Sequence, residues 1–376
     1  MASLKFQFQP TRLEIARRAT GIGKIELAED VGIDRRTLTN YLSGERVPSE
    51  EVLRRLASKL DIEPSFLFGS AISLTQDASV SFRSLARMSA STRDQALAQA
   101  DLAFLLNRWF EERFELPPCS IPDLRGEATP EVASVELRRI WGLGEGPIGN
   151  VVRLFEAWGI RVYSLMVENA DMDAVSFWRE STPFVLLNSL KTAERSRFDA
   201  AHELGHLVLH RHALTKSKDQ ENEANQFASA FLMPKHSLTA NVPGIPRLRD
   251  LIHAKKIWRV SVAALAYRLN QIQYLNEWHY RMIVTEISKK GYRKSEPEPT
   301  HYDQSHSLPM MFGQLREEGL SRHHIARDLG LSSTALDRLL RGLMMTTIAG
   351  NAGTTASVSP VAPPPTLKML NGGRQD

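Results

Sequence analysis

Cysteine is almost absent from this chain. Cys119 is the only one among 376 residues, so the chain cannot form an internal disulfide or hold a metal with a cluster of thiolates. Any metal site must therefore be built from histidine and carboxylate side chains. The single thiol lies beside Pro117 and Pro118 in an apparent linker, where we expect it to be incidental.

Long apolar runs and a large excess of charge are also missing. No apolar stretch approaches the length of about 18 residues that a membrane helix needs, and the N-terminus lacks the basic-then-apolar pattern of a signal peptide. We therefore expect a cytoplasmic protein with no membrane partner. The formal net charge of +4 is too small to indicate a nucleic-acid partner by itself. The hydrophobic content of 42% is sufficient for real cores, and the length suggests two or three domains.

One short segment carries strong chemical information. His202, Glu203 and His206 form the pattern H-E-x-x-H. Histidines four residues apart lie on one face of a helix, so both imidazoles can reach one metal ion. The glutamate between them can hold a metal-bound water and take its proton. The motif makes the chain a candidate zinc hydrolase.

The alternative is an amphipathic helix with a solvated His-Glu face. The helix has an apolar stripe of its own, so the histidines are not needed as core; the stripe consists of Phe198, Ala201, Leu204, Leu207 and Val208. Gly205 in mid-helix costs about 1 kcal/mol relative to alanine and requires a reason such as close packing. Both features favour a metal site.

A catalytic zinc needs a third protein ligand and an open position for water. His212 lies ten residues after His202, the offset of the third histidine in H-E-x-x-H-x-x-G-x-x-H enzymes. Leu209, however, stands where the glycine would let the chain leave the helix. The other source is an acid on the next predicted helix, which ends near Pro234.

That helix offers two acids, Glu221 and Glu223. They point about 200° apart around the helix axis, so only one can face the metal. We expect antiparallel packing beneath the first helix to direct Glu223 to the metal, and favour Glu223 over both Glu221 and His212. An oxyanion donor is also expected; sequence spacing does not choose among Tyr267, Arg268 and His210.

The two helices together resemble a known family. The strings R-F-D-A-A-H-E-L-G-H-L-V-L-H at 197–210 and E-N-E-A-N-Q-F-A-S-A-F-L-M-P at 221–234 are similar to the ImmA/IrrE-type metallopeptidases. The resemblance covers about residues 130–285. It implies a gluzincin-like site in which the glutamate of the E-A-N run, here Glu223, is the third ligand. It also implies site-specific proteolysis of helix-turn-helix repressors, relieving repression after DNA damage or of mobile elements.

The N-terminal region has the pattern of a helix-turn-helix. Gly32 allows a left-handed turn between two short amphipathic helices, and Asp34 is a natural N-cap for the second. The outward face of that second helix then carries four polar residues suited to bases and phosphates, namely Arg35, Arg36, Thr39 and Asn40. Residues 8–68 resemble the lambda-repressor-like (XRE) DNA-binding domain.

Charge does not decide whether this domain binds DNA or protein. Residues 1–70 have a net charge of about +1, far from the basic surface typical of an obvious DNA binder. We favour DNA as the partner, because acidic residues precede the turn and Arg35 and Arg36 follow it. Helix-turn-helix domains often pair to read two half-sites, so a homodimer is one alternative for the oligomeric state.

The sequence predicts an α+β fold in which an all-α helix-turn-helix domain precedes a mostly helical, zincin-like peptidase domain with a small sheet, followed by a helical C-terminal region. The short strands are expected near 160–165, 174–178 and 184–187. The predicted segments are a DNA-binding domain (1–69), a linker with a long helix at 91–114 (70–128), the peptidase domain (129–285), a helical region (286–345) and a disordered tail (346–376). The pair of helices expected at 320–343 is either a second helix-turn-helix or a hairpin that completes the peptidase domain.

These features predict a DNA-binding regulatory zinc metalloendopeptidase that acts in transcription regulation. Zinc is the expected metal, with Mn²⁺ as an alternative, and the expected partners are DNA and a protein substrate such as a helix-turn-helix repressor. An extended substrate peptide would add to the edge of the sheet and lie across the metal. The competing hypothesis is a transcription regulator whose peptidase-like domain senses a metal or ligand without proteolysis. Glu203 favours the protease, since a metal sensor needs no general base.

Overall fold

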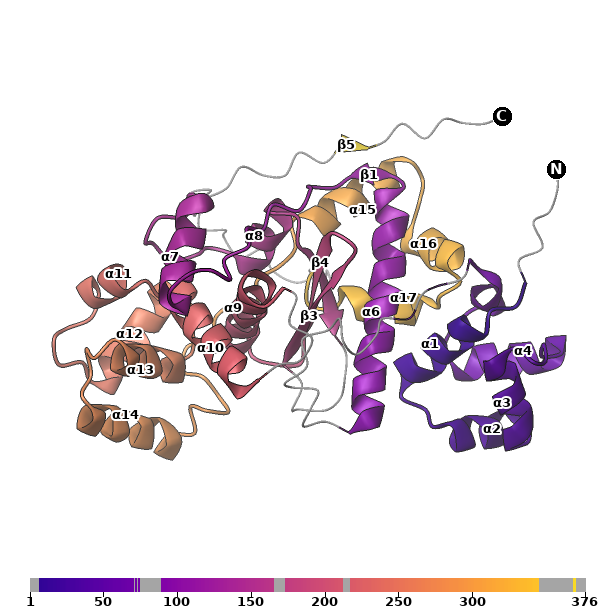
Figure 1. Ribbon diagram of the computed structural model, residues 1–376, viewed down its shortest axis with the longest axis horizontal. Helices are drawn as coiled ribbons and strands as arrows, with labels where there is room; N and C mark the ends of the chain where they lie inside the picture. The colour runs from indigo at the N-terminus through magenta and orange to yellow at the C-terminus, as the bar shows by residue number, and fades with distance from the viewer. Residues whose placement is uncertain are drawn as a thin grey trace.

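The computed structural model describes residues 7–70, 72, 74, 89–165, 173–211, 217–344 and 368–369. Its fold is α+β, as predicted: helices surround a single three-stranded sheet. The N-terminal helices lie at one end of the long axis, the sheet lies near the centre, and a cluster of helices occupies the other end (Figure 1).

The N-terminal region is entirely helical, and its turn has the predicted chemistry. Its elements are α1 (Pro10–Thr20), α2 (Lys24–Val31), α3 (Arg35–Ser43), α4 (Glu50–Lys59) and the 3-10 helix η1 (Pro64–Phe68). Gly32 ends α2 with a φ of 69°, which confirms the left-handed turn. The Asp34 side chain accepts a hydrogen bond of 2.9 Å from the Thr37 N–H and caps α3, also as predicted.

A long helix, α6 (Ala90–Glu111), joins the N-terminal helices to the sheet. On one side it packs against α1, where the Gln95 amide donates to the Ala19 carbonyl at 3.3 Å. On the other side, Asn107 accepts a hydrogen bond of 3.2 Å from the Tyr163 hydroxyl, and Asp101 pairs with Arg179 at 2.9 Å. The long helix predicted at 91–114 therefore contacts both the N-terminal helices and the sheet.

The sheet has the strand order β2-β4-β3, in which β2 (Arg161–Leu165) runs parallel to β4 (Thr182–Asn188) and β3 (Ala174–Arg179) runs antiparallel to it. Phe177 and Phe184 stack at 5.1 Å on the face that meets Phe104 of α6. Because side chains alternate along a strand, Ser176 points to the opposite face. There it meets α9 (Ala193–Leu209), which packs against β3 and β4.

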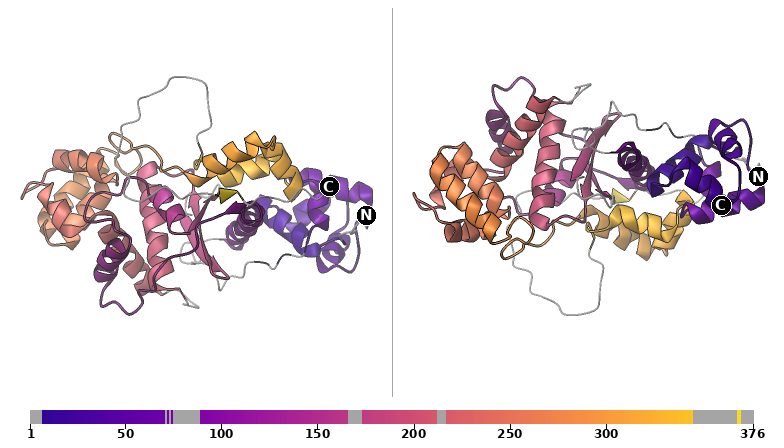
Figure 2. Two further views of the ribbon diagram at one scale, coloured as in Figure 1. Left: turned by 90° about the horizontal axis from the view of Figure 1, so that it is seen from above. Right: turned by 90° about the horizontal axis from the view of Figure 1, so that it is seen from below.

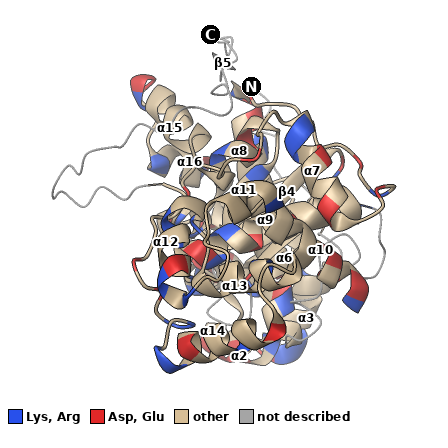
Figure 3. Ribbon diagram, turned by 90° about the vertical axis from the view of Figure 1, so that its left-hand side faces the viewer, with Lys and Arg blue, Asp and Glu red and all other residues tan. Residues whose placement is uncertain are grey.

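Helix α10 (Lys218–Leu232) packs between α9 and α7 (Pro130–Ile140). Gly205 permits the approach of α9 to α10, because a Cβ there would lie 3.1 Å from the Phe227 ring and 3.2 Å from the Ala224 Cα. This close packing is the reason that a mid-helix glycine required. The remaining helices of this part are α8 (Val151–Ala157), α11 (Lys235–Ala240), α12 (Leu248–Trp258), α13 (Val262–Gln271) and α14 (Glu277–Lys289). Basic and acidic residues are interspersed over α12 and α14 (Figure 3).

Three C-terminal helices, α15 (Ser307–Glu317), α16 (Arg322–Leu329) and α17 (Ser333–Leu340), lie beside α6 and reach the N-terminal helices (Figure 2). Helix α17 packs against β2 and α6. The turn between α16 and α17 touches the N-terminal region directly: the Gly330 carbonyl accepts a 2.9 Å hydrogen bond from the Glu63 N–H, and Leu331 forms a β-bridge with Ile62. The helical pair thus contacts both parts of the molecule.

Some predicted segments lie largely outside the described residues. Of the tail at 346–376, only β5 (Lys368–Met369) is described, and it pairs antiparallel with β1 (Phe114–Glu115). Most of residues 70–88, the first part of the linker predicted at 70–128, is likewise outside the described residues. Among the described helices, none is both long enough and apolar enough to cross a membrane.

Candidate metal centre

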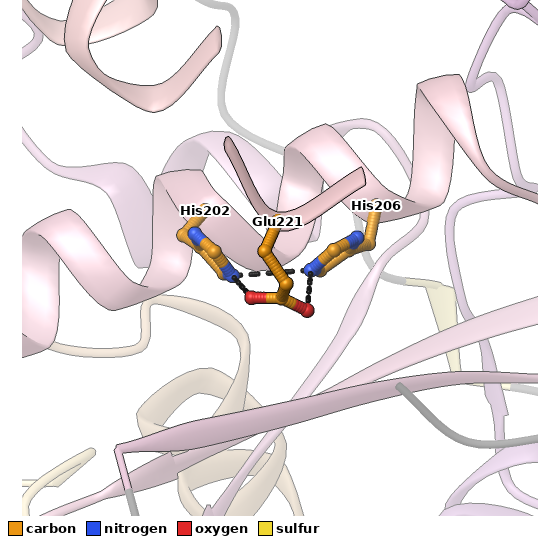
Figure 4. A group of neighbouring side chains, drawn as sticks. All are labelled: His202, His206 and Glu221. Carbon is orange, nitrogen blue, oxygen red and sulfur yellow. Dashed lines mark hydrogen bonds and ion pairs between the residues drawn. The ribbon is translucent and has the colours of Figure 1, made fainter. Parts of the chain in front are cut away.

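Two histidines one turn apart on α9 form the base of the site. The Nε2 atoms of His202 and His206 lie 3.1 Å apart and point the same way (Figure 4). The His202 side chain is 16% exposed and that of His206 is 3% exposed. The helical spacing therefore brings two imidazole nitrogens to one point. This point is buried at His206 and partly open to solvent at His202.

Glu221, in the first turns of α10, completes the group. One carboxylate oxygen lies 3.3 Å from the His202 Nε2, and the other lies 3.3 Å from the His206 Nε2. Ligand atoms of all three residues lie within 4.8 Å of one another. Two imidazoles and one carboxylate make up a donor set that suits a catalytic zinc. The residues therefore fit the metal that the sequence predicts.

The charge of Glu221 also suits a cation. Burial by itself would raise the pKa of Glu221, but the contacts with the His202 and His206 imidazoles outweigh that effect and hold the pKa well below its usual range. As a carboxylate, Glu221 places a negative charge beside the two imidazole nitrogens.

Glu223 does not face the two histidines, which corrects the expectation that it supplies the third ligand. Its side chain is 46% exposed, and its Oε2 lies 2.8 Å from the Nε2 of His210. The buried stripe of α10 explains the difference. On a helical wheel Glu221 lies about 60° from the centre of that stripe, whereas Glu223 lies about 100° away.

A second layer of side chains orients both histidines. The Nδ1 of His202 lies 3.0 Å from the Asn225 Oδ1, and the Nδ1 of His206 lies 2.9 Å from the His210 Nδ1. These contacts turn each Nε2 toward Glu221. Asn225 was not predicted, although its position four residues after Glu221 was a usable signal, since residues i and i+4 share a helix face.

Glu203 lies on the side of α9 that faces the sheet. It is 5% exposed, and its carboxylate accepts a hydrogen bond from the Ser176 hydroxyl on β3. Ser176 was also not predicted. No sequence pattern indicates its contact with Glu203, because that contact joins a strand to a helix 27 residues further along the chain.

Comparisons with known families agree with both parts of this arrangement. Residues 155–270 match the family model of the IrrE N-terminal-like domain, a peptidase family, and residues 13–67 match that of the helix-turn-helix family. The chain joins a helix-turn-helix domain to an IrrE N-terminal-like domain. No curated protein matches the chain. The protein is accordingly a DNA-binding regulator with an IrrE-like peptidase domain.

Two of the three oxyanion candidates in the IrrE-like domain already have hydrogen-bond partners. Arg268 is fully buried, donates to the Met233 carbonyl at 3.0 Å and forms a two-pronged ion pair with Glu131 of α7. His210 contacts His206 and Glu223. Tyr267 is 42% exposed on α13 and has no hydrogen bond to the site among those that the structure describes. His212 lies outside the described residues.

In the helix-turn-helix domain, α3 turns its apolar residues inward. Leu38 and Tyr41 are buried. Arg35, Arg36 and Thr39 are exposed, and Asn40 is half-buried. The Thr39 hydroxyl donates to the Arg35 carbonyl at 2.9 Å, which leaves its methyl group and an oxygen lone pair for other contacts.

Proposed function

We propose that the chain is a zinc-dependent metalloendopeptidase that its helix-turn-helix domain brings to DNA, and that it cleaves a regulatory protein there. The observation that carries the proposal is the position of Glu203. This buried acid directly follows His202 on the helix that carries both histidines of the His-His-Glu group. A domain that only sensed a metal would need the three ligands but not this acid.

His202, His206 and Glu221 would hold the metal, with Mn²⁺ as an alternative to zinc. Zinc, when bound, supplies Lewis-acid chemistry that acidifies a water molecule and polarises the scissile carbonyl. Glu203 takes the proton of the attacking water and delivers it to the leaving amine. The hydrogen bond from Ser176 fixes the orientation of the carboxylate during both transfers.

The sheet provides a place for an extended substrate. Among the described residues, β3 pairs with β4 alone, so its other edge presents unpaired backbone groups. The same strand contacts the general base through Ser176. A substrate peptide added to this edge would lie beside Glu203.

DNA and a repressor are the partners that best suit the domain combination. The exposed polar residues of α3, Arg35, Arg36, Thr39 and Asn40, would contact bases and phosphates in the major groove. We propose a helix-turn-helix repressor as the protein substrate, since both proteins would then be brought to one operator. A homodimer would present two such helices to two half-sites.

The test compares wild type with Glu203→Gln. Each protein is incubated with host lysate and zinc or manganese, new peptide termini are identified by mass spectrometry, and operator binding is measured in parallel. We expect wild type to cleave a regulatory protein and Glu203→Gln to lose at least about a hundredfold in rate. Full cleavage by Glu203→Gln would contradict the mechanism. Operator binding without cleavage by either protein would support a regulator that senses a metal or ligand.

A further inference from the structure

A line of side chains leads from the metal centre to the surface. It begins at His206, whose Nδ1 lies 2.9 Å from the Nδ1 of His210, and continues from the His210 Nε2 to the Glu223 Oε2 at 2.8 Å. The exposed fractions of these side chains are 3%, 5% and 46%. The line joins a buried candidate ligand to a carboxylate at the solvent boundary.

Hydrogen-bond chemistry gives this line one direction when Glu223 is ionised and His210 is neutral. An ionised glutamate only accepts, so the His210 Nε2 must carry a hydrogen and donate it to Glu223. In a neutral imidazole the other nitrogen then accepts, so the His210 Nδ1 receives a hydrogen from the His206 Nδ1. In this tautomer the hydrogen of His206 is on Nδ1, and Nε2 carries the electron pair that a metal ion would accept. That nitrogen is the one that faces Glu221 and His202.

We propose that Glu223 and His210 are positioning residues that select the tautomer of His206 in which Nε2 binds the metal. Glu223, which is not itself in the group of three, acts on the centre through His210. The proposal rests on the proposed zinc site. It adds that Glu223, a residue outside the centre, determines which nitrogen of His206 can bind the metal.

The position of each residue supports this assignment. His210 directly follows the last turn of α9, and its backbone N–H donates to the His206 carbonyl at 3.0 Å, so the two rings lie on the same side of the helix end. Glu223 belongs to α10. This helix begins at Lys218, directly after the capping residue Ser217, whose capping box includes Gln220. The contact therefore joins the end of one helix to the start of the next.

The two histidines of the centre have different outer partners. His202 is oriented by the amide oxygen of Asn225, whereas His206 is oriented by an imidazole that a carboxylate orients in turn. An acceptor on α10 is thus required in both cases, and a neutral amide already serves one of them. We therefore expect an acceptor oxygen at position 223 to be sufficient to hold His210, with or without the charge.

The experiment measures zinc affinity by competition with a chelator in the full-length protein, together with the visible absorption spectrum of the cobalt-substituted form. Glu223→Ala removes the acceptor, and Glu223→Gln keeps an acceptor oxygen without the charge. Asp219→Ala is the matched control, because it removes an exposed carboxylate from the first turn of the same helix.

We expect Glu223→Ala to weaken zinc binding about 10- to 100-fold and to alter the cobalt spectrum. Glu223→Gln should retain most of the affinity and the wild-type spectrum, and so should Asp219→Ala. Wild-type affinity in Glu223→Ala would overturn the proposal, and so would equal losses in the alanine and glutamine variants, which would indicate an effect of charge. A wild type that binds zinc but cleaves nothing would defeat the proposed protease and leave this proposal standing.

Discussion

Glu221 and Glu223 lie two residues apart on α10 and have different surroundings. The Glu221 side chain is 6% exposed and contacts both histidines of the centre, whereas the Glu223 side chain is 46% exposed and contacts His210. A helix rotates by about 100° per residue, so two acids at this spacing are presented to different surroundings. The inner one suits a ligand, and the outer one suits a positioning role.

Asp199 is a half-buried acid on α9, one turn before Glu203. Burial raises its pKa to about 8, and the nearby Asp173 carboxylate adds to the increase. The unfolded chain ionises this group near pH 3.9, an approximate reference value for aspartate. Its stabilising effect is therefore complete below about pH 4 and is lost as the pH rises towards 8.

Asp199→Asn should remove this dependence. The free energy of unfolding of the variant, relative to wild type, should increase between pH 5 and pH 7 by up to about 1 kcal/mol per pH unit. Urea unfolding at the two pH values measures it, with the exposed Asp219→Asn as control. An identical difference between variant and wild type at both values would show that Asp199 is ionised in the folded protein.

At this scale, motif spacing predicted the positions of His202, Glu203 and His206 on one helix. The prediction that Glu223 rather than Glu221 faces the histidines was wrong. It rested on the family resemblance and on an assumed packing direction, whereas the buried stripe of α10 lies nearer to Glu221. Asn225 could have been predicted from the i, i+4 spacing on a helix. Ser176 could not, because its contact with Glu203 depends on how the sheet packs against α9.

At the scale of elements, the contact between α9 and α10 assembles the centre, since one helix supplies both histidines and the other supplies Glu221. Gly205 sets the distance between the two helices. A Cβ at this position would approach the Ala224 backbone at 3.2 Å, and backbone atoms cannot move aside as a flexible side chain can.

Gly205→Ala should therefore weaken zinc binding. The gain in helix propensity, about 1 kcal/mol, is opposed by an overpacking cost of about 1–3 kcal/mol. We expect a net destabilisation of up to about 2 kcal/mol, measured by thermal unfolding, and a lower zinc affinity as α10 is displaced.

Gly313→Ala is the control for helix propensity. Gly313 lies within α15, and a Cβ there meets no atom within 4 Å. This variant should be more stable by up to about 1 kcal/mol and should bind zinc normally. If Gly205→Ala behaved in the same way, the helices would not be as closely packed as described.

Most elements were predictable from local pattern. The caps, glycine turns and apolar stripes of the N-terminal helices are encoded by neighbouring residues, and the three strands were expected within two residues of their observed ends. The strand order was not predictable, since the parallel pairing of β2 with β4 places β3 at the edge. That order matters because it brings Ser176 to the site.

At the scale of the whole molecule, residues 320–343 join the helix-turn-helix domain to the peptidase domain. Gly330 is one point of close contact. It has a φ of 70°, and a Cβ on it would lie 2.5 Å from the backbone nitrogen of Phe66. An ion pair of 3.4 Å between Arg338 and Asp61 lies beside it. Contacts between residues so far apart in sequence could not be predicted from the pattern of either segment.

Gly330→Ala should loosen this joint. Hydrogen exchange should increase in peptides that cover 62–67 and 325–335, while zinc affinity remains that of wild type. Gly319→Ala is matched for backbone strain, with a φ of 78° and no atom within 4 Å of its Cβ. Unchanged exchange at 62–67 in Gly330→Ala, or an equal increase there in Gly319→Ala, would show that the joint does not hold the domains.

The most direct test of the account is the zinc affinity of Glu221→Ala compared with Glu223→Ala, measured by calorimetric titration of the metal-free proteins. Wild type should bind one zinc ion, and Glu221→Ala should lose more affinity than the 10- to 100-fold or so expected for an outer residue such as Glu223. Wild-type affinity in Glu221→Ala, together with loss of binding in Glu223→Ala, would contradict the His202-His206-Glu221 centre.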